Sequence, residues 1–395
     1  MIQFDFKKDC CGCGACIASC PVNAISWTNT DEGFHVPTVN EDICINCGKC
    51  DRNCPVLSDK EKALSASEID VWMAANKNKE ELSQSASGGV FYGIANNILQ
   101  NSGVVAGVVW NESMQAVYSV SNQQSELEKM RGSKYVQALP QNCINEVLEY
   151  LKQGKKVLFS GTPCQIAGLI KCVGHPENLI TCGIICEGVA SPLVWKVYKE
   201  CLENKFGSQL INAEMRSKCD GWSGGSSRYT FANEKQYIQK RCFSLDPYIA
   251  GFIEGLFNRP CCKECKFKGV SENCDFLIGD FWGFTKEQKA KNENRGMSTV
   301  ISCTPKGKAL WNELFEDFLC EQVSYELVCK SNNIEHSGHW AKNREEFLEK
   351  IEKQSSREFE KIVWTCSGKM LKKKLMKILQ NIGILDIMQC FSKEL

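Results

Sequence analysis

The 395-residue sequence has no net charge, no long apolar run and only four histidines. Lys and Arg together number 47, as do Asp and Glu, so no overall field attracts the chain to nucleic acid or to an anionic membrane. The longest apolar stretches are strand-sized, whereas a membrane span needs roughly 18 residues. The first nine residues, MIQFDFKKD, carry charges where a signal peptide needs an apolar core. We therefore expect a cytoplasmic protein without a nucleic-acid partner.

Several catalytic motifs are also missing. No G-x-G-x-x-G follows an apolar strand, so a nicotinamide-binding Rossmann domain is unsupported, and no Walker loop is present. The histidines lie apart from any recognisable nucleophile motif, which disfavours hydrolysis. With 43% hydrophobic and 24% charged residues the composition is that of a globular chain, and the length predicts two or three domains.

Cysteine is the residue in excess, with 26 in the chain. In a long chain without a secretion signal, clustered cysteines indicate metal or redox sites rather than disulfides. Near the N-terminus the pattern C-x-x-C-x-x-C-x-x-x-C-P occurs twice, with matching flanks CGACIASCPV and CGKCDRNCPV, which indicates an internal duplication. In two-cluster ferredoxins each run gives three thiolates to one 4Fe-4S cluster and its fourth to the other. The predicted ligand sets are Cys10, Cys13, Cys16 and Cys54 for one cluster, and Cys44, Cys47, Cys50 and Cys20 for the second.

Two alternatives stay open for these cysteines, namely structural zinc sites and unligated thiols. Cys11 lies outside the pattern and is interpreted as a thiol without a ligand role. Residues 24–27 and 34–36 alternate like the strands of a short hairpin. A module this small needs its clusters to fold, because metal and sulfide make up most of its core.

The rest of the chain alternates strand-like and helical segments. The expected strands are 71–75, 104–110, 157–159, 179–185, 210–215, 276–278 and 299–301. The expected helices are 90–99, 142–151, 192–202, 248–257 and 308–318. This order predicts an α/β domain with a mixed sheet, preceded by the small α+β ferredoxin domain.

A basic helical tail is expected from about residue 331. Residues 370–388 place Leu371, Leu375 and Ile378 on one face of a helix and lysines on the other. The favoured interpretation is that this helix packs on its own domain. Contact with a membrane surface or a partner stays open, because amphipathicity describes most surface helices.

Two further patterns are weaker when taken alone. Cys262 and Cys265 form a C-x-x-C pair, which needs two more ligands to hold a cluster, and Cys164 and Cys186 each follow a predicted strand. The stretch 85–89, SASGG, precedes a predicted helix. Its backbone N–H groups could bind a dinucleotide pyrophosphate, but a plain serine N-cap is the favoured interpretation.

The order of motifs resembles the beta-subunit family of coenzyme F420 hydrogenases and dehydrogenases over nearly the whole chain up to about residue 320. The motifs follow the ferredoxin pair: SASGGV (85–90), KYVQ (134–137), GTPCQIAGL (161–169), CEGVASP (186–192), RSKCDGW (216–222), RPCCKECKF (259–267) and GDFWG (279–283). Members of this family are iron–sulfur flavoproteins that pass electrons between FAD and 4Fe-4S clusters. Some act on the deazaflavin coenzyme F420, and others take electrons from ferredoxin to reduce an unrelated substrate.

The resemblance implies particular site residues. The FAD site would be lined by Ser87, Gly88, Gly89, Lys134, Thr162, Arg216 and Lys218. A third 4Fe-4S cluster would be held by Cys164, Cys186, Cys262 and Cys265. Two departures leave that ligand set open: Glu187 stands where relatives often have His, and Cys274 replaces a small residue and could substitute as a ligand.

The sequence therefore predicts five segments: a ferredoxin domain (1–57), a linker (58–68), the two parts of a flavin-binding domain (69–150 and 151–330) and the tail (331–395). The expected activity is ferredoxin-linked reduction of a small organic molecule through iron–sulfur clusters and FAD. Coenzyme F420 as the substrate, within a larger reductase or hydrogenase, is the alternative. A subunit that transfers electrons without a substrate pocket is a third.

Overall fold

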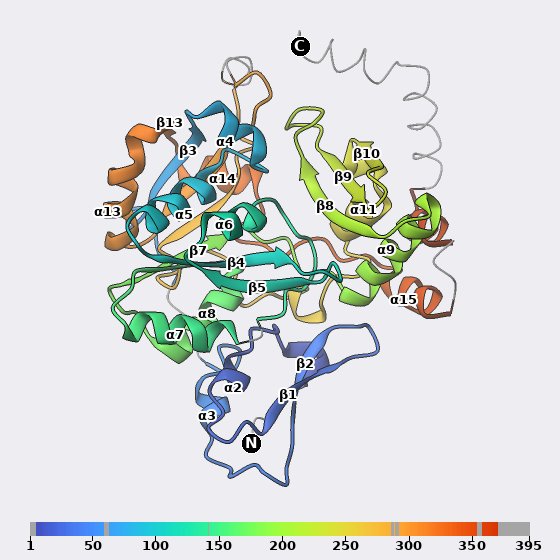
Figure 1. Ribbon diagram of the computed structural model, residues 1–395, viewed down its shortest axis with the longest axis horizontal. Coiled ribbons are helices and arrows are strands. Elements are labelled where there is room, and N and C mark those ends of the chain that lie inside the picture. Colours follow the sequence, from blue (N-terminus) through green and yellow to red (C-terminus); the bar gives the residue numbers. More distant parts are fainter. Residues whose placement is uncertain are drawn as a thin grey trace.

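The computed structural model describes residues 5–58, 63–140, 142–285, 288, 292–353 and 358–369. It shows a small N-terminal module against one side of a larger α/β body (Figure 1). The amphipathic helix predicted over residues 370–388 lies outside the described residues. Within those ranges, no helix has the length and apolarity to cross a membrane.

The N-terminal module contains the predicted hairpin, in which β1 (Ile25–Asn29) pairs antiparallel with β2 (His35–Val39). Its helices are one turn each: α1 (Phe6–Asp9), α2 (Ala15–Ala18) and α3 (Lys49–Arg52). The duplication is visible here, because α2 and α3 both start after a left-handed glycine of the repeated C-G-x-C segment. One buried cluster of the module consists of Cys16, Ile25, Cys54 and Val56. Two of these four side chains are predicted cluster ligands, which agrees with a fold that depends on its clusters.

The large domain is built on an eight-stranded mixed sheet, which confirms the predicted mixed sheet. Its spatial order is β13-β3-β12-β11-β7-β6-β4-β5. The strands are β3 (Asp70–Asn76), β4 (Val104–Trp110), β5 (Ala116–Ser121), β6 (Val157–Gly161), β7 (Leu179–Ile184), β11 (Phe276–Asp280), β12 (Ser298–Ser302) and β13 (Phe318–Gln322). The four neighbours β4, β6, β7 and β11 are parallel, so their carboxyl ends meet at one edge. In such sheets that edge is where ligands bind.

Helices cover both faces of this sheet. Alternate residues of the strands point to opposite faces, so Val104 belongs to one core and Val105 to the other. One face carries α5 (Val90–Gln100), α6 (Gln124–Met130) and α13 (Pro305–Leu314). The other carries α7 (Cys143–Lys152) and α8 (Pro163–Val173), on the side of the N-terminal module (Figure 1).

A second, three-stranded antiparallel sheet stands apart from the main one. It has the order β10 (Gln236–Lys240), β9 (Ser226–Phe231), β8 (Leu210–Ser217). The expectation that residues 210–215 join the mixed sheet is wrong. Strand β8 follows α9 (Pro192–Phe206) and turns into its own hairpin with β9, so it never returns to the main sheet. The helices packed around this sheet are α10 (Cys242–Leu245), α11 (Pro247–Ile253), α15 (Arg344–Lys353) and α16 (Phe359–Cys366).

Buried polar contacts fix the N-terminal module on the large domain. The guanidinium of Arg344 forms an ion pair with Glu32 of the β1–β2 turn, and Ser191 donates to the backbone carbonyl of Glu32 at 2.5 Å. Arg259 donates to the carbonyls of Cys10 at 2.6 Å and His35 at 3.0 Å. These contacts hold the predicted cluster ligands against the sheet edge.

Candidate functional site

Cysteines from the two duplicated runs lie beside one another in the module. Cys20 lines one small hollow together with Cys44, Cys47 and Cys50, although it comes from the other run. Among the described residues, no three Cys, His, Asp or Glu side chains lie close enough to hold a single metal ion.

Cys54, the fourth cysteine of the second run, lies near thiols of the first run. Burial raises the pKa of Cys16, and so do the neighbouring thiols of Cys10 and Cys54. The fourth cysteine of each run thus lies near thiols of the other run, which is the neighbourhood that the ligand exchange of two-cluster ferredoxins needs.

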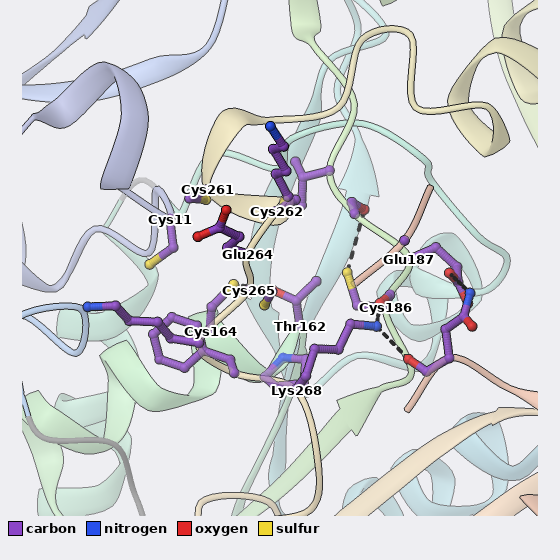
Figure 2. A pocket seen from close by; sticks show the side chains of 18 of the residues that line it. Cys11, Thr162, Cys164, Cys186, Glu187, Cys261, Cys262, Glu264, Cys265 and Lys268 are labelled. Atoms are coloured by element: carbon purple, nitrogen blue, oxygen red, sulfur yellow. Dashed lines mark hydrogen bonds between the residues drawn. The ribbon is translucent and has the colours of Figure 1, made fainter. Parts of the chain in front are cut away.

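A second group of cysteines lines a cavity of about 350 Å³ between the module and the large domain, here called the thiol cavity (Figure 2). Its six thiols are Cys11, Cys164, Cys186, Cys261, Cys262 and Cys265. The four that the resemblance implied as ligands are all among them. Cys274 is not in the lining and is buried beside Gly183 of β7.

Each wall of the thiol cavity comes from a separate part of the chain. Cys164 lies in the first turn of α8, whose N-cap Thr162 forms a reciprocal capping box with Gln165. The hydroxyl of Thr162 is 3.1 Å from the Cys164 sulfur. Cys186 follows β7, and Cys262 ends the short helix η1 (Pro260–Cys262). Side chains that are distant in sequence thus meet at the carboxyl edge of the parallel strands.

As free thiols these cysteines hold their protons strongly. The pKa of Cys186 is raised well above its ordinary value by burial and by the thiols of Cys262 and Cys164. Burial, together with the Cys164 thiol, raises the pKa of Cys265 to about 12. Crowded, buried thiols lose their protons readily when a metal binds to them, because the charge of the metal stabilises the thiolates. The donor set therefore fits a metal–sulfur group.

Basic side chains surround the thiol cavity. Lys268 donates to the backbone carbonyls of Cys186 at 2.6 Å and Asn333 at 2.5 Å, and its charge opposes the rise in the pKa of Cys186 (Figure 2). Lys266 bonds to the carbonyl of Val56 in the module at 2.9 Å. The lining carries charges of both signs, because Asp9, Glu187 and Glu264 also belong to it.

A neighbouring cavity of about 310 Å³, here called the strand-end cavity, lies at the carboxyl ends of β6, β7 and β11. Five residues of the implied FAD site line it: Ser87, Gly89, Lys134, Thr162 and Arg216. The two cavities share the residues Cys11, Thr162, Ile185 and Val189. A group bound in one would therefore be separated from the other by a single layer of side chains.

Arg216 is the strongest indication that the strand-end cavity binds a ligand. Its side chain is 2% exposed and lies 3.1 Å from a carboxylate oxygen of Asp280, yet none of its three guanidinium nitrogens has a partner in hydrogen-bond geometry. The guanidinium also lies over the rings of Phe243 and Trp282, at 4.6 and 5.2 Å from their centroids. Buried polar groups are usually satisfied, so these donors are available to a bound acceptor such as a phosphate or a flavin carbonyl.

The two implied lysines have different positions. Lys134 lines the strand-end cavity and donates to the carbonyls of Lys129 and Arg131, and burial lowers its pKa to about 7. Lys218 is not in the lining. It donates to the carbonyls of Leu82 and Ser87, so it supports the 85–89 turn from behind.

The 85–89 turn departs from one prediction. The sequence favours a serine N-cap, but α5 has Gly89 as its N-cap and no side-chain cap, so that interpretation is wrong. Ser87 donates to the carbonyl of Met297, and the N–H of Gly88 donates to Ser298 of β12, so the turn is bound to the sheet edge. Gly88 itself faces the sheet and lies outside the cavity lining.

The sequence interpretation missed several residues at the site. Cys11 was assigned no role, but it lies beside the thiols of Cys13 and Cys164 and lines both cavities. Cys261, Arg259 and Lys268 were likewise unassigned. Cys261 and Arg259 belong to the motif RPCCKECKF (259–267), which was interpreted only through its cysteine spacing. Arg259 precedes these cysteines and Lys268 follows them, so the flanking basic residues were the available signal.

Together, a ferredoxin-type module and a mixed α/β domain with a thiol-lined cavity at its sheet edge define an iron–sulfur protein with a redox role. Residues 9–57 match the 4Fe-4S dicluster domain, and residues 154–326 match the family described as the C terminus of the coenzyme F420 hydrogenase/dehydrogenase beta subunit. Over residues 154–326 the chain is thus similar to the family that its motifs predicted. No curated protein matches the sequence.

One similar solved structure is the F420-reducing [NiFe] hydrogenase complex from Methanosarcina barkeri. Its matching chain is 18% identical, with a TM-score of 0.47, and the similarity covers 75% of this chain and 92% of that one.

Proposed function

We propose that the protein is an iron–sulfur flavoprotein oxidoreductase that exchanges electrons between 4Fe-4S clusters and FAD, coupled to ferredoxin-linked reduction of a small organic substrate. The supporting observation is the shared wall between the thiol cavity and the strand-end cavity. Bound FAD would exchange two electrons with a substrate and single electrons with iron–sulfur clusters.

The ligand residues proposed for the clusters follow the two thiol groups of the module and the thiol cavity. Cys10, Cys13, Cys16 and Cys54 would hold the first cluster, and Cys44, Cys47, Cys50 and Cys20 the second. Cys164, Cys186, Cys262 and Cys265 would hold a third. Cys47 is exposed whereas Cys13 is buried against α8. The second set is thus the one open to a redox partner, and the first faces the large domain.

The residues proposed for FAD have distinct roles. Arg216 and Lys134 would balance negative charge on the phosphates or on the reduced ring, since both line the strand-end cavity. Ser87 and Gly89 would present the turn to the ligand, with Lys218 holding the turn in place.

The alternative substrate is coenzyme F420, which is supported by the family matched over residues 154–326. In that case the protein would connect F420 to a larger reductase or hydrogenase.

Anaerobic purification, with iron counted and the released cofactor identified, tests the proposal. FAD and about twelve iron atoms per chain are expected. The oxidised protein is then mixed with reduced coenzyme F420 or with reduced ferredoxin while flavin and cluster absorbance are recorded. Bleaching by F420 would establish the alternative, and bleaching by ferredoxin alone supports the main proposal. Absence of flavin would leave an electron-transfer subunit and overturn the oxidoreductase.

A further inference from the structure

Arg259 is a buried cation at the junction of the module and the large domain. It is 2% exposed, and its Nε and Nη2 donate to the carbonyls of Cys10 and His35. The chain makes room for it at Gly12, where a Cβ atom would lie 2.9 Å from Nη1 of Arg259. Its own backbone N–H is fixed to the carbonyl of Val189 at 2.8 Å. The guanidinium is thus held in one place from both sides of the junction.

No carboxylate neutralises this charge. In the described part of the chain, Arg259 forms no ion pair with Asp or Glu, and its Nη1 has no hydrogen-bond partner. Together with burial, its charge lowers the pKa of His35, and it also acts on thiols of both sites, namely Cys10 and Cys11 in the module and Cys261 and Cys262 in the thiol cavity. A guanidinium buried without a compensating anion is strongly unfavourable. The groups near Arg259 that can become anionic are these thiols, as cluster thiolates.

We propose that Arg259 is a counter-charge shared by two iron–sulfur clusters, the one held through Cys10 and the one held through Cys262. This inference rests on the proposed function, because the second of these is the third cluster. A cluster gains one negative charge when it accepts an electron, and its reduction potential depends on nearby charge and hydrogen bonds. A fixed cation between two clusters therefore favours the reduced form of both.

Arg344 supplies a matched control. It is also buried and also joins the module to the large domain, through Glu32 and the carbonyl of Asn258. Its charge, however, is neutralised by the Glu32 carboxylate. Removing Arg344 disturbs the docking of the module without removing an uncompensated charge.

The experiment compares the full-length chain with Arg259→Gln, Arg259→Lys and Arg344→Gln. Each protein is purified anaerobically, its iron is counted, and it is titrated with redox mediators while the electron paramagnetic resonance signal of each cluster is recorded. In Arg259→Gln the equilibrium constant for one-electron reduction of the first and third clusters is expected to fall about tenfold. This corresponds to a decrease of about 59 mV in their reduction potentials. The reduction potential of the second ferredoxin cluster should stay close to its wild-type value in Arg259→Gln. In Arg259→Lys and Arg344→Gln the potentials of all clusters should stay close to the wild-type values.

Unchanged potentials in an Arg259→Gln protein that keeps its iron would overturn the inference, and so would a shift of only one cluster. An equal shift in Arg344→Gln would also overturn it, because docking would then be the cause. If Arg259→Gln loses its iron, the Arg259→Lys variant becomes the test. Wild-type iron content and potentials in Arg259→Lys support the charge role, and loss of either contradicts it. A wild-type protein with about eight iron atoms and two cluster signals would instead refute the third cluster, which is a separate failure of the proposed function.

Discussion

Cys13 of the module lies directly against Gly168 of α8. A Cβ atom at position 168 would be 2.7 Å from both the Cβ and the sulfur of Cys13. Nearby, the thiol of Cys172 approaches the carbonyl of Ala15 at 3.6 Å. Helix α8 therefore carries Cys164 of the thiol cavity at its start and contacts a proposed ferredoxin ligand one turn later.

Gly168→Ala should weaken the docking of the module. The added methyl group overlaps Cys13, and overpacking of this kind costs about 1–3 kcal/mol. We expect faster loss of iron on exposure to a chelator and a lower thermal midpoint. Lys171→Ala on the same helix is the control and should behave like the wild type. Wild-type iron retention in the Gly168→Ala variant would show that the module can shift without cost.

Cys262→Ala should lose about four iron atoms per chain and keep the ferredoxin pair. The matched variant Cys261→Ala changes the adjacent thiol in the same cavity and should keep all of its iron. Iron content and the resonance spectrum of the reduced protein distinguish the two. Full iron retention in Cys262→Ala would refute the proposed third ligand set, and equal loss in Cys261→Ala would show that the ligands had been assigned to the wrong cysteine.

Arg216→Met should weaken FAD binding about tenfold to a hundredfold, because a charge-assisted hydrogen bond contributes about 1.5–3 kcal/mol. The control is Arg228→Met, since Arg228 lies in the same small sheet and pairs with Glu214, a half-exposed contact of little energetic weight. Retained flavin and its dissociation constant are the measurements. Equal flavin content in both variants would contradict a role for Arg216 in the strand-end cavity.

FAD affinity should depend on pH through Lys134. Burial lowers the pKa of this lysine to about 7, so the ammonium is charged below pH 7 and neutral above it. An anionic ligand raises that pKa by stabilising the charged form, so binding should weaken as pH rises above 7, by about tenfold for each unit of the ligand-induced rise. Titrations of the flavin-free protein at pH 6 and pH 8 measure the effect. Lys134→Met should show weaker binding with no such slope, and an unaltered slope would assign it to another group.

Much of the fold was predictable because its signals are local. The apolar run of β4 and the periodicity of α5 and α7 fixed these elements nearly to the residue. Helix α8 was missed because its start, GTPCQ, contains the residues of a turn, and the capping box that begins it uses Thr and Gln in place of the more familiar Ser and Glu. The separate sheet of β8–β10 was missed because a strand's pattern does not say which sheet it joins.

Spacing predicted the two ligand sets of the module, and the resemblance implied the third, but neither could describe the surroundings of these cysteines. A C-x-x-C pattern indicates which thiols share a turn. Cys11, however, lies beside Cys164 only because the N-terminal module docks on the large domain. The proposed role of Arg259 depends on its having no carboxylate beside it among the described residues, which is a property of the folded chain.

The thiol cavity has walls from residues 8–56 of the module and from residues 162–338 of the large domain. During synthesis the N-terminal module leaves the ribosome first, and domains commonly fold in that order. On the proposed ligand assignment, the first two iron centres can be installed while most of the chain is still being made. The third has no complete site until Cys265 has emerged and the domain has closed on the module. Maturation of the protein would then have a fixed order, with the centre nearest the flavin inserted last.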